Sequence, residues 1–181
     1  RDCLLSRGLG DVYKRQAMME PMAVAVHAMR RFYIEKDSSV CVIGLGTIGL
    51  LLTMFLKAEG IQNVYVEGNK DMQKHFAQKL GVDDEHYNVD NVVADYVFEC
   101  VGKNETINRA IELAAPAGNI VLVGNPYSEM NIPKDTYWKI LRKQLKLSGT
   151  WNSSYAGESG DDWHYVLNML ADGRIDPEQF I

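Results

Sequence analysis

Long apolar runs, which a membrane-spanning helix requires, are missing from this sequence of 181 residues. A helix that crosses a bilayer needs about 20 consecutive apolar residues. The longest apolar stretch covers only residues 48–56 and is interrupted by Thr53. The sequence therefore excludes a helical membrane protein.

Basic residues are also in the minority, with 19 Lys and Arg against 24 Asp and Glu and a formal net charge of −5. Proteins that bind the phosphate backbone of nucleic acids carry a basic face. This balance of charge predicts no nucleic-acid partner, and the missing apolar run predicts no membrane partner.

Cysteine is scarce too, since the chain has only Cys3, Cys41 and Cys100. Their spacing matches no metal-binding motif, and three cysteines do not make the even-numbered set of a disulfide framework. A disulfide-rich secreted protein and a self-contained zinc knuckle are therefore not expected. The expected location is the reducing cytoplasm.

What the sequence does contain is an ordinary globular composition, with 46% hydrophobic and 24% charged residues. A chain of this length buries a substantial core and is typical of one domain. Residues 1–16 are the exception, because they carry charges at both ends and lack the apolar centre of a signal peptide. We expect residues 1–16 to be a foreign or disordered leader, and residues 17–181 to form the domain.

Short β-branched segments alternate along the chain with segments typical of helices, and glycine or proline marks most boundaries. Such alternation is typical of a parallel sheet wound by right-handed crossovers. The sequence thus predicts an α/β fold, a doubly wound, three-layer parallel sheet of Rossmann type. The predicted strands cover residues 39–43, 63–66, 95–100, 119–123 and 145–150, and the predicted helices cover residues 20–31, 50–58, 71–80, 105–114, 135–142 and 161–171.

A glycine-rich turn, Gly44-x-Gly46-x-x-Gly49, lies directly between a predicted strand and a predicted helix. In a dinucleotide fingerprint the first glycine permits the tight turn, the second lets the backbone approach a pyrophosphate, and the third lets helix and strand pack closely. The free N–H groups at the helix start, near Thr47 and Ile48, would then hold the phosphates. The alternative is a glycine turn with a purely structural role.

An acidic residue at the end of the second strand is expected to hold the ribose hydroxyls of such a cofactor. Glu67, 18 residues after Gly49, is in the right place and would favour NAD over NADP. Lys70 points the other way, because a cation here accepts the 2′-phosphate of NADP. The alternative for Glu67 is a solvated carboxylate at a strand end.

Three further strand ends carry residues that suit a cofactor site. Val101 and Gly102, Gly124, and Thr150 all follow predicted strands. Ligands of open α/β sheets lie at the carboxyl ends of the strands, and glycine there lets a ring lie against the backbone. Each of these ends alone is more often a plain turn, but together they favour a site.

Glu20 precedes Pro21, a residue that favours the first turn of a helix. On these residues alone, Glu20 is an exposed carboxylate favoured by the helix dipole. His27, two turns further along the same face, is most simply a packed, hydrogen-bonded histidine.

Taken as a set, these motifs resemble the zinc-dependent medium-chain dehydrogenases, and most closely their polyol branch. The resemblance rests on the segment 18–27 with its Glu-Pro pair, on the Gly-Leu-Gly-Thr-Ile-Gly turn and on Glu-Cys-Val-Gly at 99–102. The segments 140–143 and 149–151 narrow it to the polyol branch. It covers residues 18–181.

The resemblance implies oxidation of a secondary alcohol to a ketone, with hydride transfer to NAD or NADP and a zinc ion as Lewis acid. It places Gly44, Gly46, Thr47, Ile48 and Gly49 at the pyrophosphate. It implies a polyol or sugar-alcohol phosphate as substrate and a homo-oligomeric complete enzyme.

The remaining site residues follow from the same resemblance. Glu67, Asn69 and Lys70 would face the adenosine ribose, and the nicotinamide side would be lined by Val101, Gly102, Gly124 and Thr150. Glu20 would face the catalytic zinc, which reverses the interpretation from the residues alone.

Three departures from the family pattern limit these expectations. The N-terminal catalytic domain with its other zinc ligands is missing, and the C-terminus stops before the family's return to that domain, so we expect this fragment to be inactive alone. The family's ribose-binding Asp aligns with Gly68, so the choice between NAD and NADP stays open. The crossover over residues 82–95 is too short for the strand and helix that the family has there. We therefore expect this third strand of the family pattern to be short or absent and its helix to be missing.

Two alternatives use similar sequence features. A methyltransferase of Rossmann type also has a glycine-rich turn after its first strand, but it requires an additional antiparallel strand that the sequence does not indicate. A non-catalytic NAD-binding module would share the turn without any catalytic partner domain.

Overall fold

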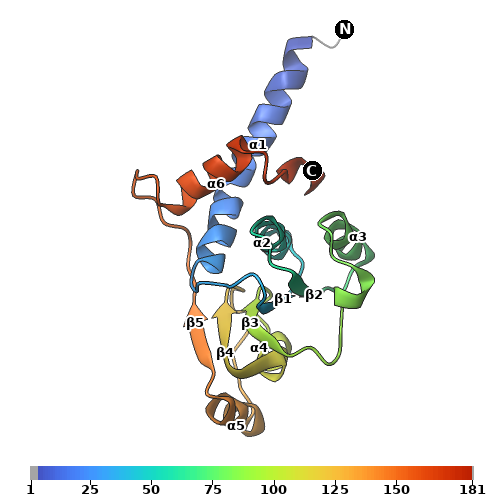
Figure 1. The fold of residues 1–181 in the computed structure, drawn as a ribbon, viewed down its shortest axis with the longest axis vertical. Helices are drawn as coiled ribbons and strands as arrows, with labels where there is room; N and C mark the ends of the chain where they lie inside the picture. Colours follow the sequence, from blue (N-terminus) through green and yellow to red (C-terminus); the bar gives the residue numbers. More distant parts are fainter. Residues whose placement is uncertain (1–3, 181) are drawn as a thin grey trace.

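The computed structural model describes the backbone of residues 4–180 and the side chains of residues 17–178 and 180. At its centre is a parallel five-stranded sheet with the strand order β2-β1-β3-β4-β5 (Figure 1). The predicted Rossmann-type architecture is confirmed. The strands are β1 (Ser39–Ile43), β2 (Asn63–Glu67), β3 (Ala94–Glu99), β4 (Ala114–Leu122) and β5 (Lys146–Gly149).

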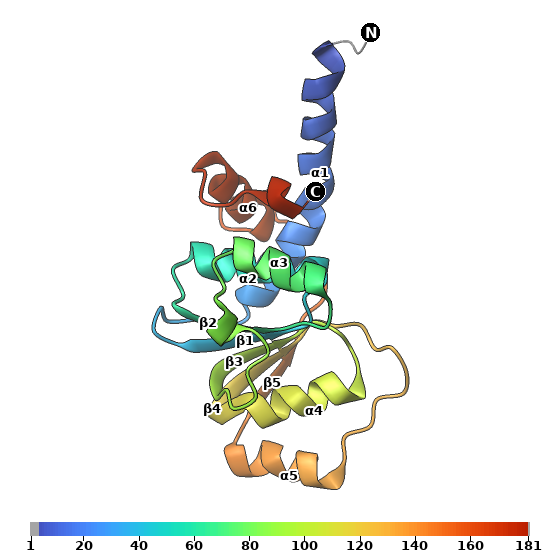
Figure 2. The ribbon, with the colours of Figure 1, turned by 90° about the vertical axis from the view of Figure 1, so that its right-hand side faces the viewer.

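Helices cover both faces of the sheet, which gives the three predicted layers (Figure 2). One face is covered by α1 (Leu4–Met29), α2 (Thr47–Ala58), α3 (Asp71–Lys79) and α6 (Asp162–Ala171), and the other by α4 (Asn104–Leu113) and α5 (Lys134–Lys143). Two 3₁₀ turns, η1 (Asp84–His86) and η2 (Pro177–Phe180), complete the set of elements. None of the helices in the described part of the chain has the length and apolarity needed to cross a membrane.

The alternation of side chains along β1 divides the core between the two faces. Val40 and Val42 pack with the buried residues of α1, α2 and α6, whereas Cys41 and Ile43 pack with those of α4. Successive strand residues point to opposite faces, and both faces are covered, so residues 40–43 are all apolar and buried.

The strand order reverses at β1. The chain passes from β1 to β2 on one side and then crosses to β3 on the other side of β1. Ligands of doubly wound sheets bind in the crevice outside the carboxyl ends of the strands at such a point. The Gly44 turn follows β1 directly and so lies at this crevice.

The crossover between α3 and β3 is shortened, as predicted. The crossover itself contains no further strand among the described residues. It has only the single parallel bridge between Val66 and Tyr87, preceded by η1. No helix forms over residues 89–94. The prediction of a short third strand and a missing helix is confirmed.

The start of α1 differs from the prediction. The helix begins at Leu4 and carries Pro21 inside it, whereas the sequence predicted a start at residue 20 with proline in the first turn. Proline removes one backbone donor, but its fixed φ is compatible with a helix. Residues 4–16 are part of this helix. Their side chains lie outside the described residues, and a foreign or disordered leader over residues 1–16 stays a prediction.

Two other boundaries also moved. Helix α2 begins at Thr47, three residues earlier than predicted, because Gly46 already serves as its N-cap. Strand β4 begins at Ala114, directly after α4, and not at residue 119. An irregularity in its pairing with β3 and a positive φ of 61° at Ala117 accommodate Pro116 within the strand.

The buried carboxylate of Asp162 joins the two ends of the chain. Its Oδ2 lies 2.8 Å from His27 Nδ1 and accepts from the backbone N–H and hydroxyl of Ser154 at 2.7 and 2.8 Å, while Oδ1 accepts from Arg30 at 3.0 Å. The residue is only 2% exposed. This network holds α6 and the preceding loop against α1.

Asp161, the N-cap of α6, is similarly saturated. Its oxygens accept from the backbone and ring nitrogens of His164 at 2.8 and 2.9 Å, and from the backbone of Ala156 and Gly157 at 3.0 and 3.1 Å. Burial alone raises the pKa of Asp161, but these hydrogen bonds outweigh it and lower the pKa below the usual range. The pKa of Asp162 is lowered in the same way by Ser154 and His27, against the effect of burial.

Replacing Asp162 is expected to destabilise the domain. Asp162→Ala removes the acceptor shared by Arg30, His27 and Ser154, and losing hydrogen bonds to a charged group costs about 2 kcal/mol. The free energy of unfolding from urea titration measures the loss. Asp172→Ala, at the exposed C-terminal end of the same helix, is the control and should stay near the parent value. An equal effect of both variants would contradict the role of the network.

The two aspartates also predict a loss of stability in acid. A carboxyl whose pKa is lowered by folding stabilises the protein above its unfolded pKa of about 3.9, and this contribution disappears as the pH falls through the folded pKa. The urea midpoint should therefore drop steeply below about pH 4. Asp161→Asn does not titrate at that position, so its midpoint should be lower at pH 7 and fall less in acid. A parallel pH profile of this variant would contradict the assignment.

Candidate functional site

The glycine turn after β1 has a geometry that only glycine permits. Gly44 has a φ of +94°, and a Cβ there would lie 2.3 Å from Val101 Cγ2. A Cβ at Gly49 would lie 1.9 Å from the carbonyl oxygen of Gly44. Helix α2 can therefore begin directly against the end of β1 only because the first and third glycines lack side chains.

The second glycine of the motif faces open space. No atom lies within 4 Å of the position that a Cβ would take at Gly46, which is the N-cap of α2 and makes no side-chain capping bond. The first N–H groups of a helix have no partner within the helix. Those of Thr47 and Ile48 are therefore available at the positive end of the helix dipole, where anions bind.

A crevice of about 540 Å³ extends from this turn along the carboxyl ends of the strands. It reaches the end of β2 and the turn after β3, so it joins the predicted phosphate and ribose residues. The residues that line it are Ile43, Gly44, Leu45, Gly46, Glu67, Gly68, Asn69, Lys70, Gln73, Asn88, Cys100, Val101, Lys103 and Thr106.

A second cavity of about 300 Å³ adjoins the crevice on the other side of Gly46 and Lys70. Met18 of α1, Thr47 of α2 and Phe180 of η2 line it. The Phe180 ring also meets the ring of Phe76 at 5.9 Å between centroids. The last described residues of the chain thus lie beside the start of α2.

Glu67 ends β2, as predicted, but its carboxylate is not free. Oε1 accepts from Nε of Arg109 at 2.8 Å, and NH2 of the same guanidinium lies 2.7 Å away. The hydrogen bond to Glu67 is the main reason that the pKa of Arg109 is raised. Arg109 was not among the predicted site residues, because it lies on α4, 42 residues later in the chain. No local pattern predicts such a tertiary pair.

The loop after Glu67 is fixed by two side-chain amides. Asn88 accepts from the N–H of Gly68 and donates to its carbonyl, both at 2.9 Å. Gln73 accepts from the N–H of Asn69 at 3.0 Å. These bonds give the loop a defined backbone, from which Asn69 and Lys70 extend as exposed residues.

A buried carboxylate shapes the turn after β3. Glu99 is fully buried, and its Oε1 accepts from the backbone N–H groups of Val101 and Gly102, both at 2.9 Å. The sequence analysis recognised this strand end but not the role of Glu99. A glutamate that ends an apolar strand and is followed by a glycine is the available signal.

The glycines on the predicted nicotinamide side bring two loops into contact. A Cβ at Gly102 would lie 1.8 Å from the carbonyl oxygen of Asn125, and one at Gly124 would lie 2.2 Å from the backbone nitrogen of Gly102. The turns after β3 and β4 therefore pack backbone against backbone. Neither glycine lines the crevice, although Val101 does.

Thr150 continues the pairing of β4 with β5. Its N–H donates to the carbonyl of Leu122 at 3.1 Å. Its hydroxyl oxygen is buried and has no hydrogen-bond partner among the described residues. Buried hydroxyls without a hydrogen-bond partner are uncommon in folded proteins.

Glu20 is exposed on α1. The side chains of residues 17–178 and 180 contain no group of three or more His, Cys, Asp or Glu that suits a metal ion. A single carboxylate does not hold a zinc ion, which takes about four ligands. The described residues therefore do not fit a zinc site by themselves.

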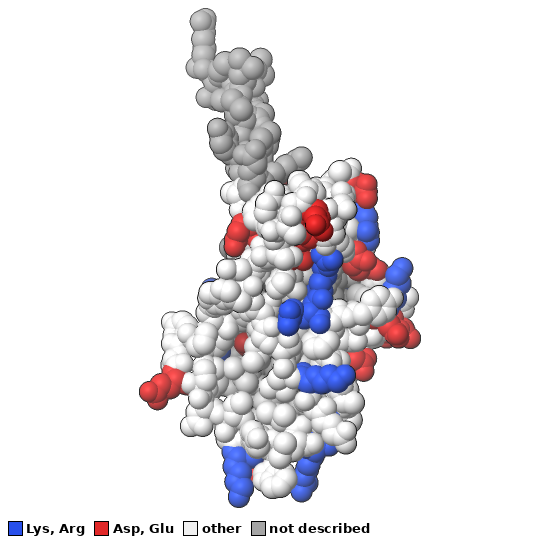
Figure 3. Space-filling model, turned by 90° about the vertical axis from the view of Figure 1, so that its left-hand side faces the viewer, with Lys and Arg blue, Asp and Glu red and all other residues white. Residues whose placement is uncertain are grey.

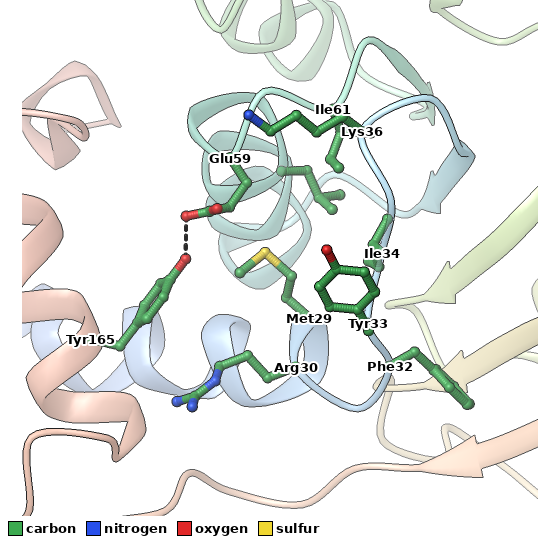
Figure 4. Close-up of a pocket in the computed structure, with 10 residues that line it drawn as sticks. Met29, Arg30, Phe32, Tyr33, Ile34, Lys36, Glu59, Ile61 and Tyr165 are labelled. Atoms are coloured by element: carbon green, nitrogen blue, oxygen red, sulfur yellow. Dashed lines mark hydrogen bonds between the residues drawn. The ribbon is translucent and has the colours of Figure 1, made fainter.

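A separate cavity of about 240 Å³ lies between the end of α1, the loop before β1, α2 and α6 (Figure 4). The Tyr165 hydroxyl donates to Glu59 across one side of it, and Arg174 pairs with Glu59 at 3.1 Å. Burial is the main cause of the raised pKa of Tyr165. Residues 32–36 in its wall precede β1, so this cavity lies away from the glycine turn.

The family comparison agrees with the site. The family described as "Zinc-binding dehydrogenase" matches residues 47–172, which is well over half of the chain. The chain belongs to the zinc-binding dehydrogenase family. The matched region begins at the first residue of α2 and extends to the end of α6. The resemblance predicted from the sequence is confirmed, and the methyltransferase alternative is left without support.

Individual relatives point to the polyol branch. Galactitol 1-phosphate 5-dehydrogenase of Escherichia coli K12 is 26% identical over 178 residues, which cover 91% of this chain and 51% of the relative. The chain spans about half the length of the curated relatives it matches.

Solved structures share the fold. A zinc-binding dehydrogenase of Sinorhizobium meliloti 1021 bound to NADP superposes with a TM-score of 0.76 at 22% identity, over 90% of this chain and 50% of that one. An alcohol dehydrogenase of Escherichia coli CFT073 in complex with NADH gives a TM-score of 0.77 at 22% identity, over 90% and 49%. At this level of identity, the similarity establishes the architecture.

The geometry of the turn predicts different melting temperatures when Gly46 and Gly49 are each replaced by alanine. In the interior of a helix, alanine is more favourable than glycine by about 1 kcal/mol. Gly49→Ala should nevertheless lower the melting temperature, because its Cβ collides with the Gly44 carbonyl. Gly46→Ala, which meets no atom within 4 Å, should melt close to the parent chain. Thermal unfolding followed by circular dichroism measures both, and a stable Gly49→Ala would refute the close packing.

Proposed function

We propose that this chain is the cofactor-binding part of a zinc-dependent polyol dehydrogenase, which oxidises a secondary alcohol to a ketone with NAD or NADP. The observation that carries the proposal is the glycine turn at the strand-order reversal, with an open crevice at Gly46 and tight packing at Gly44 and Gly49. This arrangement fits a dinucleotide because it combines unpaired N–H groups with room for the cofactor.

In this proposal the pyrophosphate lies at the start of α2, where it receives hydrogen bonds from Thr47 and Ile48. The three glycines, Gly44, Gly46 and Gly49, let it approach the backbone. The adenosine ribose faces the loop of Glu67, Asn69 and Lys70, which lines the same crevice.

The nicotinamide would lie towards Val101, Gly102, Gly124 and Thr150. Support comes from Val101 in the wall of the crevice and from the unpaired hydroxyl of Thr150. The contacting turns at Gly102 and Gly124 close off this end, which would restrict how deeply a ring enters and so hold it in one orientation.

The reaction transfers a hydride from the alcohol carbon to the nicotinamide. In zinc-dependent dehydrogenases the metal supplies Lewis-acid activation of the alcohol oxygen. Because the described residues do not provide a zinc ligand set, the contribution of this chain is to bind and orient the cofactor. We propose that Glu20 faces the zinc site of the complete enzyme, where other parts of the protein supply the remaining ligands. A polyol or sugar-alcohol phosphate is the proposed substrate, in keeping with the relatives.

The complete enzyme is proposed to be a homo-oligomer in the cytoplasm. Large exposed apolar side chains gather on α5 and on the β5 edge, including Trp138, Leu141, Leu147 and Trp151. Figure 3 shows broad uncharged areas between scattered basic side chains on this side of the molecule. Exposed apolar patches of this kind favour association. Cys41 and Cys100 are free thiols, which supports a reducing compartment.

The proposal is tested by titrating the full chain with NADH and NADPH and following their fluorescence. Saturable binding is expected for the parent chain. Gly46→Val places a branched side chain where the pyrophosphate would lie and should abolish binding while the fold is kept. Gly160→Val is the matched control, since Gly160 also has open space around its Cβ position and lies far along the chain. If the folded parent chain binds neither cofactor, the proposal is wrong.

A further inference from the structure

The acidic residue that would read the ribose is already paired within the protein. Both contacts from Arg109 go to Oε1 of Glu67, at 2.7 and 2.8 Å, and the Glu67 side chain is only 19% exposed. A carboxylate discriminates against a 2′-phosphate through its negative charge. When a guanidinium lies at hydrogen-bond distance, most of that charge is compensated. Glu67 therefore presents a nearly neutral pair, and not an isolated anion, to the crevice.

Arg109 is also held from its other side. Its NH2 group donates to the carbonyl of Val89 at 3.2 Å, and weaker contacts at 3.4 Å reach the carbonyl of Asp90. These carbonyls belong to the segment that replaces the third crossover. The guanidinium is thus fixed between β2 and this segment, so that its pairing with Glu67 does not depend on a flexible surface side chain.

The opposite side of the ribose loop is positive. Lys70 is exposed and lines both the crevice and the adjoining cavity. Within the described part of the chain its ammonium has neither an ion-pair nor a hydrogen-bond partner. Lys103, also in the crevice wall, lies 5.1 Å from the ring of Tyr127. Lys70 is therefore the lysine with an unpaired ammonium among the described residues that line the crevice with the compensated Glu67.

Gly68 provides no side-chain hydrogen-bond acceptor in the loop after β2. It directly follows Glu67, the last residue of β2, and offers no side chain that could accept a ribose hydroxyl. Its backbone is tied to Asn88, while a Cβ would lie 2.8 Å from the Tyr87 hydroxyl. The loop thus combines an absent acid, a compensated acid and an unpaired lysine.

We propose that this site selects the 2′-phosphorylated cofactor, NADP(H), over NAD(H). Lys70 binds the 2′-phosphate, and Arg109 is a specificity-determining residue that acts by compensating Glu67. This inference rests on the proposed function, since it concerns the ribose end of the same crevice. A charge-assisted hydrogen bond to a phosphate contributes about 1.5–3 kcal/mol, which corresponds to at least about tenfold in affinity.

The test is a set of fluorescence titrations of the full chain with NADPH and with NADH. The parent chain should bind NADPH at least about tenfold more tightly. Lys70→Met should lower the affinity for NADPH by about the same factor and leave that for NADH nearly unchanged. Lys139→Met is the matched control, because Lys139 forms its ion pair with Glu112 on the surface away from the crevice and should alter neither affinity.

Arg109 and Glu67 are tested as a pair. Arg109→Met exposes the charge of Glu67 and should weaken NADPH more than NADH. Adding Glu67→Gln removes that charge and should restore the preference for NADPH. Glu67→Gln alone keeps the size of the side chain, so it provides a folded variant even if Arg109→Met unfolds, and it should retain or increase NADPH binding. A purely structural role of Arg109 would lower both affinities equally.

The outcomes separate the two proposals. If neither cofactor binds to the folded parent chain, both are wrong. If NADH binds as tightly as NADPH or more tightly, the proposed function stands and the inference is overturned, because the free Oε2 of Glu67 then accepts the ribose hydroxyls despite Arg109. Equal losses for both cofactors in Lys70→Met would also overturn it, since Lys70 would then contact the pyrophosphate.

Discussion

The close approach of Gly49 to the carbonyl of Gly44 is the constraint on which the rest of the domain depends. A Cβ position only 1.9 Å from a backbone oxygen leaves no room for any other residue. Because of this contact, α2 starts directly over the end of β1, beside the crevice that Gly46 lines and with Thr47 in the wall of the adjoining cavity. The same position of α2 lets it pack against α1. The packing of the helices on this face of the sheet and the position of the crevice therefore both depend on the contact between Gly44 and Gly49.

Three carboxylates in this domain each accept hydrogen bonds that hold a turn, a helix or a side chain in place. Glu99 accepts the backbone N–H groups of the turn after β3, Asp162 joins α6 to α1, and Glu67 pairs with Arg109. Buried carboxylates are tolerated when hydrogen bonds replace their lost hydration. Asp162 and Glu67 receive donors from α1 and α4, far away in the sequence, whereas Glu99 receives its donors from the turn that follows it. These residues therefore fix how loops and helices meet.

The features that the sequence predicted well depend on short-range order. The glycine turn, the alternation of strands and helices and the missing crossover follow from spacing alone, and the crossover could be inferred because the segment between Gly81 and Ala94 is too short for a helix. The start of α1 was not predictable, because Pro21 is a common first-turn residue and nothing local distinguishes a helix that continues through it. The roles of Arg109 and Asn88 were also hidden, since each depends on a partner that only the folded chain brings near.

The shortened crossover has a consequence for the energetics of the β2 edge. Beyond β2 the sheet continues only as the single bridge at Tyr87 and the hydrogen bond from Asn88 to Val66, so this edge lacks the ladder that stabilises an inner strand. Regions with so few backbone bonds open locally at low free energy. Asn88 and the carbonyls that hold Arg109 belong to this same segment, and Asn88 also lines the crevice beside the loop after β2. Binding of the proposed cofactor would therefore stabilise this edge against local unfolding and protect its backbone amides from exchange.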